Sequence, residues 1–195
     1  MEQLINLAKK FILQPKDAWE VVKDETTTAQ QHIMNYLIPL ALIPTIATFI
    51  GHGFIGMGLI GPSLKWGLTE AVTIFIATIV GVFISGFIIQ KLGPTFDTQV
   101  SFDKAVKLVG FAYTPMLVAG ILYIIPALGI IVALAGLYSL YVLYTGFKPM
   151  TGVSEEKSTG YFVVSLIVII VVYIIIGIIL GALFVTFGVA RAGLF

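Results

Sequence analysis

The sequence predicts an all-α protein of the membrane: a bundle of five transmembrane helices behind a short N-terminal amphipathic segment on the cytoplasmic side. Three observations predict this class. Of the 195 residues, 58% are hydrophobic and only 11% are charged, whereas soluble domains are about 25% charged. The mean hydropathy is +1.05. Several uncharged stretches are also long enough for a helix to cross a bilayer.

The spans follow from these uncharged stretches. A hydrocarbon core of about 30 Å requires about 20 apolar residues at a rise of 1.5 Å each. Residues 108–147 form an uncharged run about twice that long, which must fold back, and Pro126 and Gly129 mark the expected turn. We therefore expect a cytoplasmic segment over 1–31 and a transmembrane domain over 32–195. Its predicted spans lie near residues 33–50, 66–90, 106–124, 127–147 and 160–190.

The N-terminal segment reads as two short helices at the cytoplasmic interface. Leu4, Ala8 and Phe11 repeat at helical spacing and form one apolar face. Pro15 suits the first turn of a second helix, in which Trp19 is expected to anchor the segment at the headgroups. The alternative is a helix packed against the underside of the bundle. Under the interfacial interpretation, removal of residues 1–14 leaves the bundle folded.

The composition offers little for chemistry. The chain has no cysteine, which excludes disulfides, thiol catalysis and Cys-ligated metals. His32 and His52 fall at opposite ends of the first span and cannot share a metal. A net charge of +1 provides no basic surface for nucleic acid. We therefore expect no enzyme activity, catalytic residue, cofactor or metal, and no nucleic-acid partner.

One acidic residue, Glu70, lies inside a predicted span, where an ionisable side chain is a functional hypothesis by default. It is about four residues from the outer boundary, at the depth of Thr45, Thr48 and Tyr123, so a structural hydrogen bond and an ion or proton site are both open.

A second polar layer comprises Tyr113, Thr114 and Tyr138. Hydroxyls at this depth are typical of interhelical hydrogen bonds. Pro115 should kink the third span beside them, so a cavity is the alternative.

Small residues supply a candidate packing site in the fifth span. Gly177 and Gly181 match the GxxxG pattern, which serves contacts within a subunit or between subunits. Membrane lipids are the expected partners, with membrane proteins or a second copy of the chain as alternatives.

Three stretches resemble the prokaryotic members of the Yip family. They are residues 14–22 (QPKDAWEVV), 109–117 (VGFAYTPML) and the aromatic-rich 137–146 (LYSLYVLYTG). The resemblance implies five spans with a cytoplasmic N-terminus. Eukaryotic members bind Rab GTPases, but only about thirty residues precede the first span here in place of their long cytosolic region, so Rab binding is not expected.

Two functional hypotheses remain. The first is a non-enzymatic scaffold or adaptor of the cell membrane that organises lipid or protein partners. The alternative is a small ion or solute transporter or channel that uses Glu70 and the kinked third helix. A transporter needs several polar groups that converge at one depth, whereas a scaffold does not.

The distribution of basic residues predicts the topology. Nine lysines lie on one side of the spans, and only Lys65 and Arg191 lie on the other. By the positive-inside rule the N-terminus is cytoplasmic and the C-terminus is outside. Reporter fusions after Met150 and after Phe195 should therefore report opposite sides, and a cytoplasmic signal after Phe195 would contradict the five-span topology.

Overall fold

Five helical stretches in the computed structural model are long and apolar enough to cross a membrane, which confirms the all-α class and the count of spans. The structure describes residues 2–56 and 61–192, with the side chains of the last helix as far as Ile179. The five stretches are Ala29–Ile55, Leu64–Phe96, Phe102–Ile124, Pro126–Thr151 and Glu155–Ile179. Each contains the corresponding predicted span or most of it.

The N-terminal segment forms α1 (Glu2–Leu13) and α2 (Pro15–Val22). The first span combines α3 (Ala29–His32), η1 (Ile33–Leu37), α4 (Ile38–Ile50) and η2 (Gly51–Ile55), and the second combines α5 (Leu64–Leu92) and η3 (Gly93–Phe96). The third span consists of α6 (Phe102–Ala112), α7 (Thr114–Ala119) and η4 (Gly120–Ile124). The last two spans are η5 (Pro126–Leu128) with α8 (Gly129–Thr151), and α9 (Glu155–Ala192).

Hydroxyl side chains set where several of these helices begin. Thr28 accepts the backbone N–H of Gln31 at 3.2 Å, and the Gln31 side chain accepts the N–H of Thr28 at 3.0 Å. This capping box satisfies two N–H groups that the first turn leaves unpaired. Ser63 and Ser101 cap α5 and α6 in the same way through their side-chain oxygens.

The predicted kink in the third span is present at Pro115. The helix is interrupted at Tyr113, between the end of α6 and the start of α7. Pro115 has no N–H for the carbonyl of Phe111, one turn earlier. The hydroxyl of Thr114 donates to that carbonyl at 2.6 Å instead. A residue of the predicted polar layer thus satisfies the backbone group that the proline leaves free.

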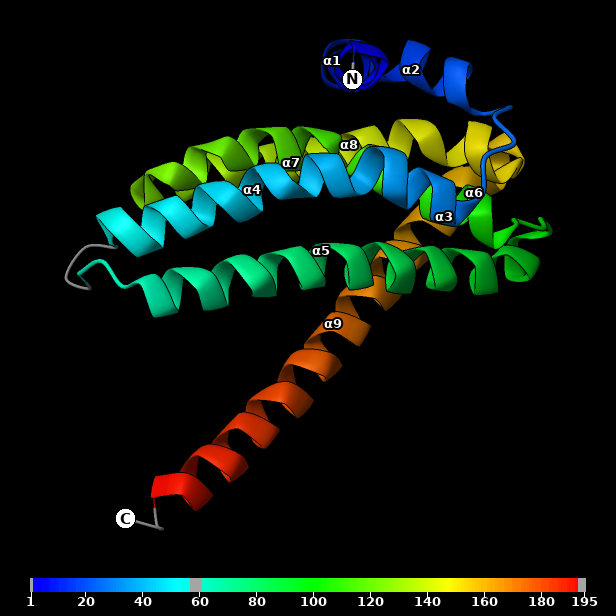
Figure 1. Ribbon diagram of the computed structural model, residues 1–195. Coiled ribbons are helices and arrows are strands. Elements are labelled where there is room, and N and C mark those ends of the chain that lie inside the picture. Colours follow the sequence, from blue (N-terminus) through cyan, green and yellow to red (C-terminus); the bar gives the residue numbers. More distant parts are fainter. Residues whose placement is uncertain (1, 57–60, 193–195) are drawn as a thin grey trace.

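The spans pack unequally. In Figure 1, α4 and α5 run side by side, while α9 leaves the bundle at an angle. The third span is the most central, because 67% of its apolar window is buried, compared with 6% for the fifth. The apolar side chains along this described part of α9 therefore face outward from the chain.

The N-terminal segment belongs to the protein core. Phe11 and Trp19 are fully buried, in one cluster with Phe111 of α6 and Phe147 of α8. The Phe11 ring stacks on Phe111 with centroids 4.9 Å apart and meets Trp19 edge-on at 4.7 Å. The structure therefore agrees with the packed alternative for this segment, under which α1 is part of the core and its removal destabilises the bundle.

A substitution at Phe11 measures how much this packing contributes. Because the ring is fully buried, Phe11→Ala should lower the free energy of unfolding by about 3–5 kcal/mol. The control is Leu13→Ala on the same helix, where the side chain is 75% exposed and the expected change is about 0.5 kcal/mol. Denaturation of both variants in detergent micelles tests this. Similar losses in the two variants would show that α1 is not part of the core.

Candidate functional site

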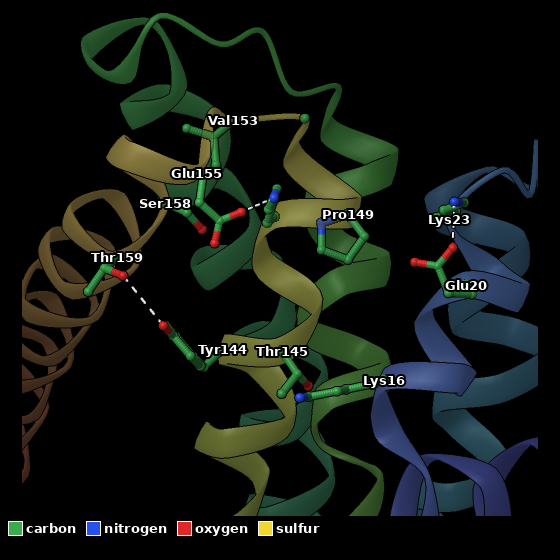
Figure 2. A pocket seen from close by; sticks show the side chains of 12 residues that line it. Lys16, Glu20, Lys23, Tyr144, Thr145, Pro149, Val153, Glu155, Ser158 and Thr159 are labelled. Atoms are coloured by element: carbon green, nitrogen blue, oxygen red, sulfur yellow. Dashed lines mark hydrogen bonds and ion pairs between the residues drawn. The ribbon is translucent and has the colours of Figure 1, made fainter.

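A cleft with a volume of about 760 Å³ lies between α2 and the junction of α8 with α9 (Figure 2). We call it the α2–α8 cleft. It is lined by Lys16, Glu20, Lys23, Tyr144, Thr145, Lys148, Pro149, Gly152, Val153, Glu155, Ser158 and Thr159. Charged, hydroxyl and apolar groups therefore share one site whose volume is typical of small-molecule binding sites.

Helix α2 supplies one wall through its helical period. Lys16, Glu20 and Lys23 follow one another at i, i+4 and i+7, so they share a face. The opposite face, which includes Ala18 and Trp19, is buried. Glu20 and Lys23 form an ion pair at 2.5 Å. The hydrogen bond with Glu20 raises the pKa of Lys23 above its ordinary value.

The other wall is built where α8 turns into α9. Gly152 ends α8 in the left-handed region, at φ 68°, a conformation that favours glycine. The turn places Glu155, in the first turn of α9, beside Lys148, and the two form an exposed ion pair. Figure 2 shows Glu155 beside Ser158, and Thr159 beside Tyr144, whose hydroxyls are 3.4 Å apart.

Trp19 holds the two walls together. Its indole N–H donates to the carbonyl of Val142 at 3.0 Å and lies 3.3 Å from the hydroxyl of Thr145. The ring fills a notch at Gly146, where a Cβ would overlap the indole carbons. With no exposed surface, Trp19 cannot contact lipid headgroups. The expectation that Trp19 is an interfacial anchor is therefore wrong; the residue anchors α2 to α8.

The cleft lies where the charged part of each helix meets the apolar part. Helix α8 carries no charged residue before Lys148, and α9 carries none over residues 158–179. The lining residues lie at this boundary, on the side that the distribution of lysines predicts to be cytoplasmic. This depth corresponds to the headgroup region of a bilayer.

The structure gives Glu70 a local partner. Its carboxylate accepts the indole N–H of Trp66 at 3.3 Å, one turn earlier on α5. Thr45, expected at the same depth, donates instead to the carbonyl of Ala41 at 2.8 Å. In the described part of the chain, Glu70 does not meet the deeper polar layer.

The deeper layer itself divides into separate contacts. The hydroxyls of Thr114 and Tyr36 are 2.8 Å apart. Tyr138 donates to the carbonyl of Ile12 at 2.8 Å and so ties α8 to α1. Tyr113 lines a cavity of about 290 Å³ near the kink, together with Tyr123 and other residues. Among the described residues, neither Glu70 nor Tyr138 lines this cavity.

Gly177, the described member of the predicted glycine pair in the fifth span, has no close neighbour among the described residues. A Cβ on Gly177 would have no atom within 4 Å. The surroundings of Gly181 lie outside the described residues. The GxxxG packing site, within the subunit or between subunits, therefore stays a prediction.

Sequence reasoning missed the residues that form the α2–α8 cleft. The spacing of Lys16, Glu20 and Lys23 could have identified its α2 wall, but their position opposite Lys148 depends on long-range packing. It also missed the burial of Lys107, which was used only as one of the nine lysines that predict the topology. Lys107 is 2% exposed and donates to the carbonyl of Glu25 at 2.6 Å.

Comparisons with known proteins agree with this architecture. The family model described as the Yip1 domain matches residues 9–179. The inner membrane protein YohC of Escherichia coli K12 is 25% identical over 162 residues, which cover 79% of this chain and 83% of that protein. YohC of Escherichia coli O6:H1 matches to the same extent. No solved structure matches.

Proposed function

This chain is a member of the Yip1 domain family, and from that premise we propose that it is a non-enzymatic scaffold or adaptor of the inner membrane. Its partners are membrane lipids or membrane proteins. The inner-membrane location is supported by the names of the two Escherichia coli relatives, both called inner membrane proteins, and by the five apolar helices of this chain.

The observation that supports a scaffold most strongly is that packing holds the two walls of the α2–α8 cleft in place. A helix of only eight residues is unstable in water when it is isolated. Without packing against the bundle, α2 would therefore not hold its polar side chains in a fixed position. Here the buried indole of Trp19 fixes α2 against α8. The charged face of α2 is therefore held in a constant position relative to Lys148 and Glu155, as a binding surface requires.

The contacts of the polar side chains in the membrane also support a structural use. Thr114 donates to a backbone carbonyl at the kink, and Tyr138 donates to the end of α1. Ser139 accepts the backbone N–H of Met116 at 3.2 Å. Each of these contacts joins two helices or repairs an interrupted helix, which is the usual role of such groups in membranes.

The transport alternative is favoured by one observation, the cavity of about 290 Å³ beside the kinked third span. Tyr113, Tyr123, Tyr173 and Thr78 bring hydroxyls to this cavity. Glu70, the one acidic residue expected in a pathway, is instead bonded to Trp66. A proton or cation pathway would therefore have to connect Glu70 with this cavity, and among the described residues Glu70 does not line it.

Substitution of Glu70 distinguishes the two functions. Under the scaffold proposal Glu70→Gln retains a hydrogen-bond acceptor for Trp66, so its stability should change by less than about 1 kcal/mol. Glu70→Leu removes the acceptor and should cost more. Purified protein in liposomes should pass no more protons or cations than protein-free liposomes.

The informative comparison is the flux of the unaltered chain and of Glu70→Gln, measured alongside their thermal stability in detergent. Glu70→Leu serves as the control for a structural effect. Reproducible flux that is lost in Glu70→Gln while its stability is unchanged would replace the scaffold proposal with the transport alternative.

A further inference from the structure

We propose that the cavity beside the kink of the third span binds an uncharged, lipid-soluble ketone or quinone through its carbonyl oxygen. This cavity has a volume of about 290 Å³ and shares no lining residue with the α2–α8 cleft. The inference goes beyond the proposed scaffold function and does not depend on it, because it assigns a ligand to a second site.

All five spans contribute to the lining of this cavity. One lining residue from each span, in chain order, is Pro44, Thr78, Tyr113, Val132 and Tyr173. Thr78 is the middle residue of α5, which runs from Leu64 to Leu92. The cavity therefore lies near the centre of the membrane, and a ligand that reaches it from the bilayer must dissolve in hydrocarbon.

The cavity is accessible from the side of the bundle. Two of its lining residues, Ala77 of α5 and Tyr173 of α9, are exposed on the surface of the chain. Figure 1 shows α9 leaving the bundle at an angle to α5. An exposed side chain at mid-span faces acyl chains, so the ligand can enter laterally from the bilayer.

The lining requires an uncharged ligand. Among the described lining residues none is acidic or basic. Hydroxyl groups come from Thr78, Tyr113, Tyr123 and Tyr173, and the other lining residues are apolar. A charged head at this depth would be buried without a counter-ion, which is strongly unfavourable. The group that the cavity recognises is therefore polar but neutral.

Two of the phenolic hydroxyls lie close together at Gly81 of α5. A Cβ on Gly81 would be 2.5 Å from the Tyr173 oxygen and 3.9 Å from the Tyr113 oxygen, so the absence of a side chain makes room for both. Tyr123, ten residues beyond Tyr113 on the third span, brings a third hydroxyl. Among the described residues, the hydroxyl of Tyr123 has no hydrogen-bond partner, whereas that of Tyr138 is bonded to a backbone carbonyl.

The number of donors favours a ligand that only accepts hydrogen bonds. Each hydroxyl brings one O–H, so hydroxyls that bond in a row leave the last proton without an acceptor. Even with Tyr113 and Tyr173 bonded to each other, one O–H of that pair is left for a ligand, and Tyr123 supplies another. An alcohol or a phenol would accept one of these protons but add its own. A carbonyl oxygen accepts without donating, and it removes the cost of a buried unpaired donor.

Depth and volume narrow the class of carbonyl compound. The ester carbonyls of phospholipids lie in the interfacial region, not at the middle of a span. A volume of about 290 Å³ is at the lower limit of small-molecule sites, which span about 300–1,000 Å³. The cavity thus suits the ring of a ketone or quinone, with an apolar tail left in the bilayer.

The test uses the full chain purified in detergent and radiolabelled probes, with the amount bound to protein-free micelles subtracted. The probes are a methylated benzoquinone and the corresponding hydroquinone, benzene and benzoate, all with the same alkyl tail. The quinone should bind about tenfold more tightly than the benzene, because only the quinone accepts hydrogen bonds. The hydroquinone and the benzoate should also bind more weakly than the quinone. Binding of any of the three that equals or exceeds that of the quinone would overturn the proposal.

Tyrosine-to-phenylalanine variants locate the binding. Tyr113→Phe and Tyr123→Phe remove one hydroxyl each and keep the ring, so each should reduce the preference for the quinone over the benzene about fivefold. The preference is the decisive quantity, because a distorted cavity would lose both probes together. Tyr141→Phe is the matched control, since Tyr141 is an exposed tyrosine of α8 that does not line the cavity.

The control variant should keep the preference of the unaltered chain. A preference that stays the same in both lining variants, or that falls as far in Tyr141→Phe, would overturn the proposal. Neither result bears on the scaffold function, which is tested by the flux measurements on Glu70→Gln.

Discussion

The contact between the Trp19 indole and the notch at Gly146 is the interaction on which the described architecture depends. Helix α2 has only eight residues, so its own hydrogen bonds are too few to stabilise it. Burial of a tryptophan contributes several kcal/mol, and its N–H finds an acceptor in Val142. Once α2 is fixed on α8, the stacking of Phe11 on Phe111 fixes α1, and Lys16 lines one cleft together with residues of α8 and α9.

The parts of the fold that were predicted correctly arise from local chemistry. A run of uncharged residues twice the thickness of a bilayer must turn, and it turns at Pro126 and Gly129. Pro115 interrupts its helix because a proline lacks the N–H that continues it. Such effects involve residues within a turn or two of one another, so a single sequence contains them.

The position of the N-terminal segment and the candidate site could not be predicted in the same way. An apolar stripe on a short helix has the same sequence pattern whether it contacts lipid or protein. The position of Trp19 was therefore compatible both with an anchor in the headgroups and with a helix packed against the bundle. The α2–α8 cleft joins residues more than a hundred positions apart, and no local pattern records that contact. Glu70 differs, because its partner Trp66 lies four residues away, at a spacing that places both on one helix face.

The most direct test of the central claim is quenching of Trp19 fluorescence in the Trp66→Phe variant, where Trp19 is the single remaining tryptophan. The variant is reconstituted in lipid bilayers, and its fluorescence is measured in two experiments. In the first, brominated lipids are the quencher within the bilayer; in the second, acrylamide is the quencher in the aqueous phase. A side chain with no exposed surface should emit at short wavelength and resist both quenchers. Strong quenching by brominated lipid would contradict the account and return Trp19 to the bilayer interface.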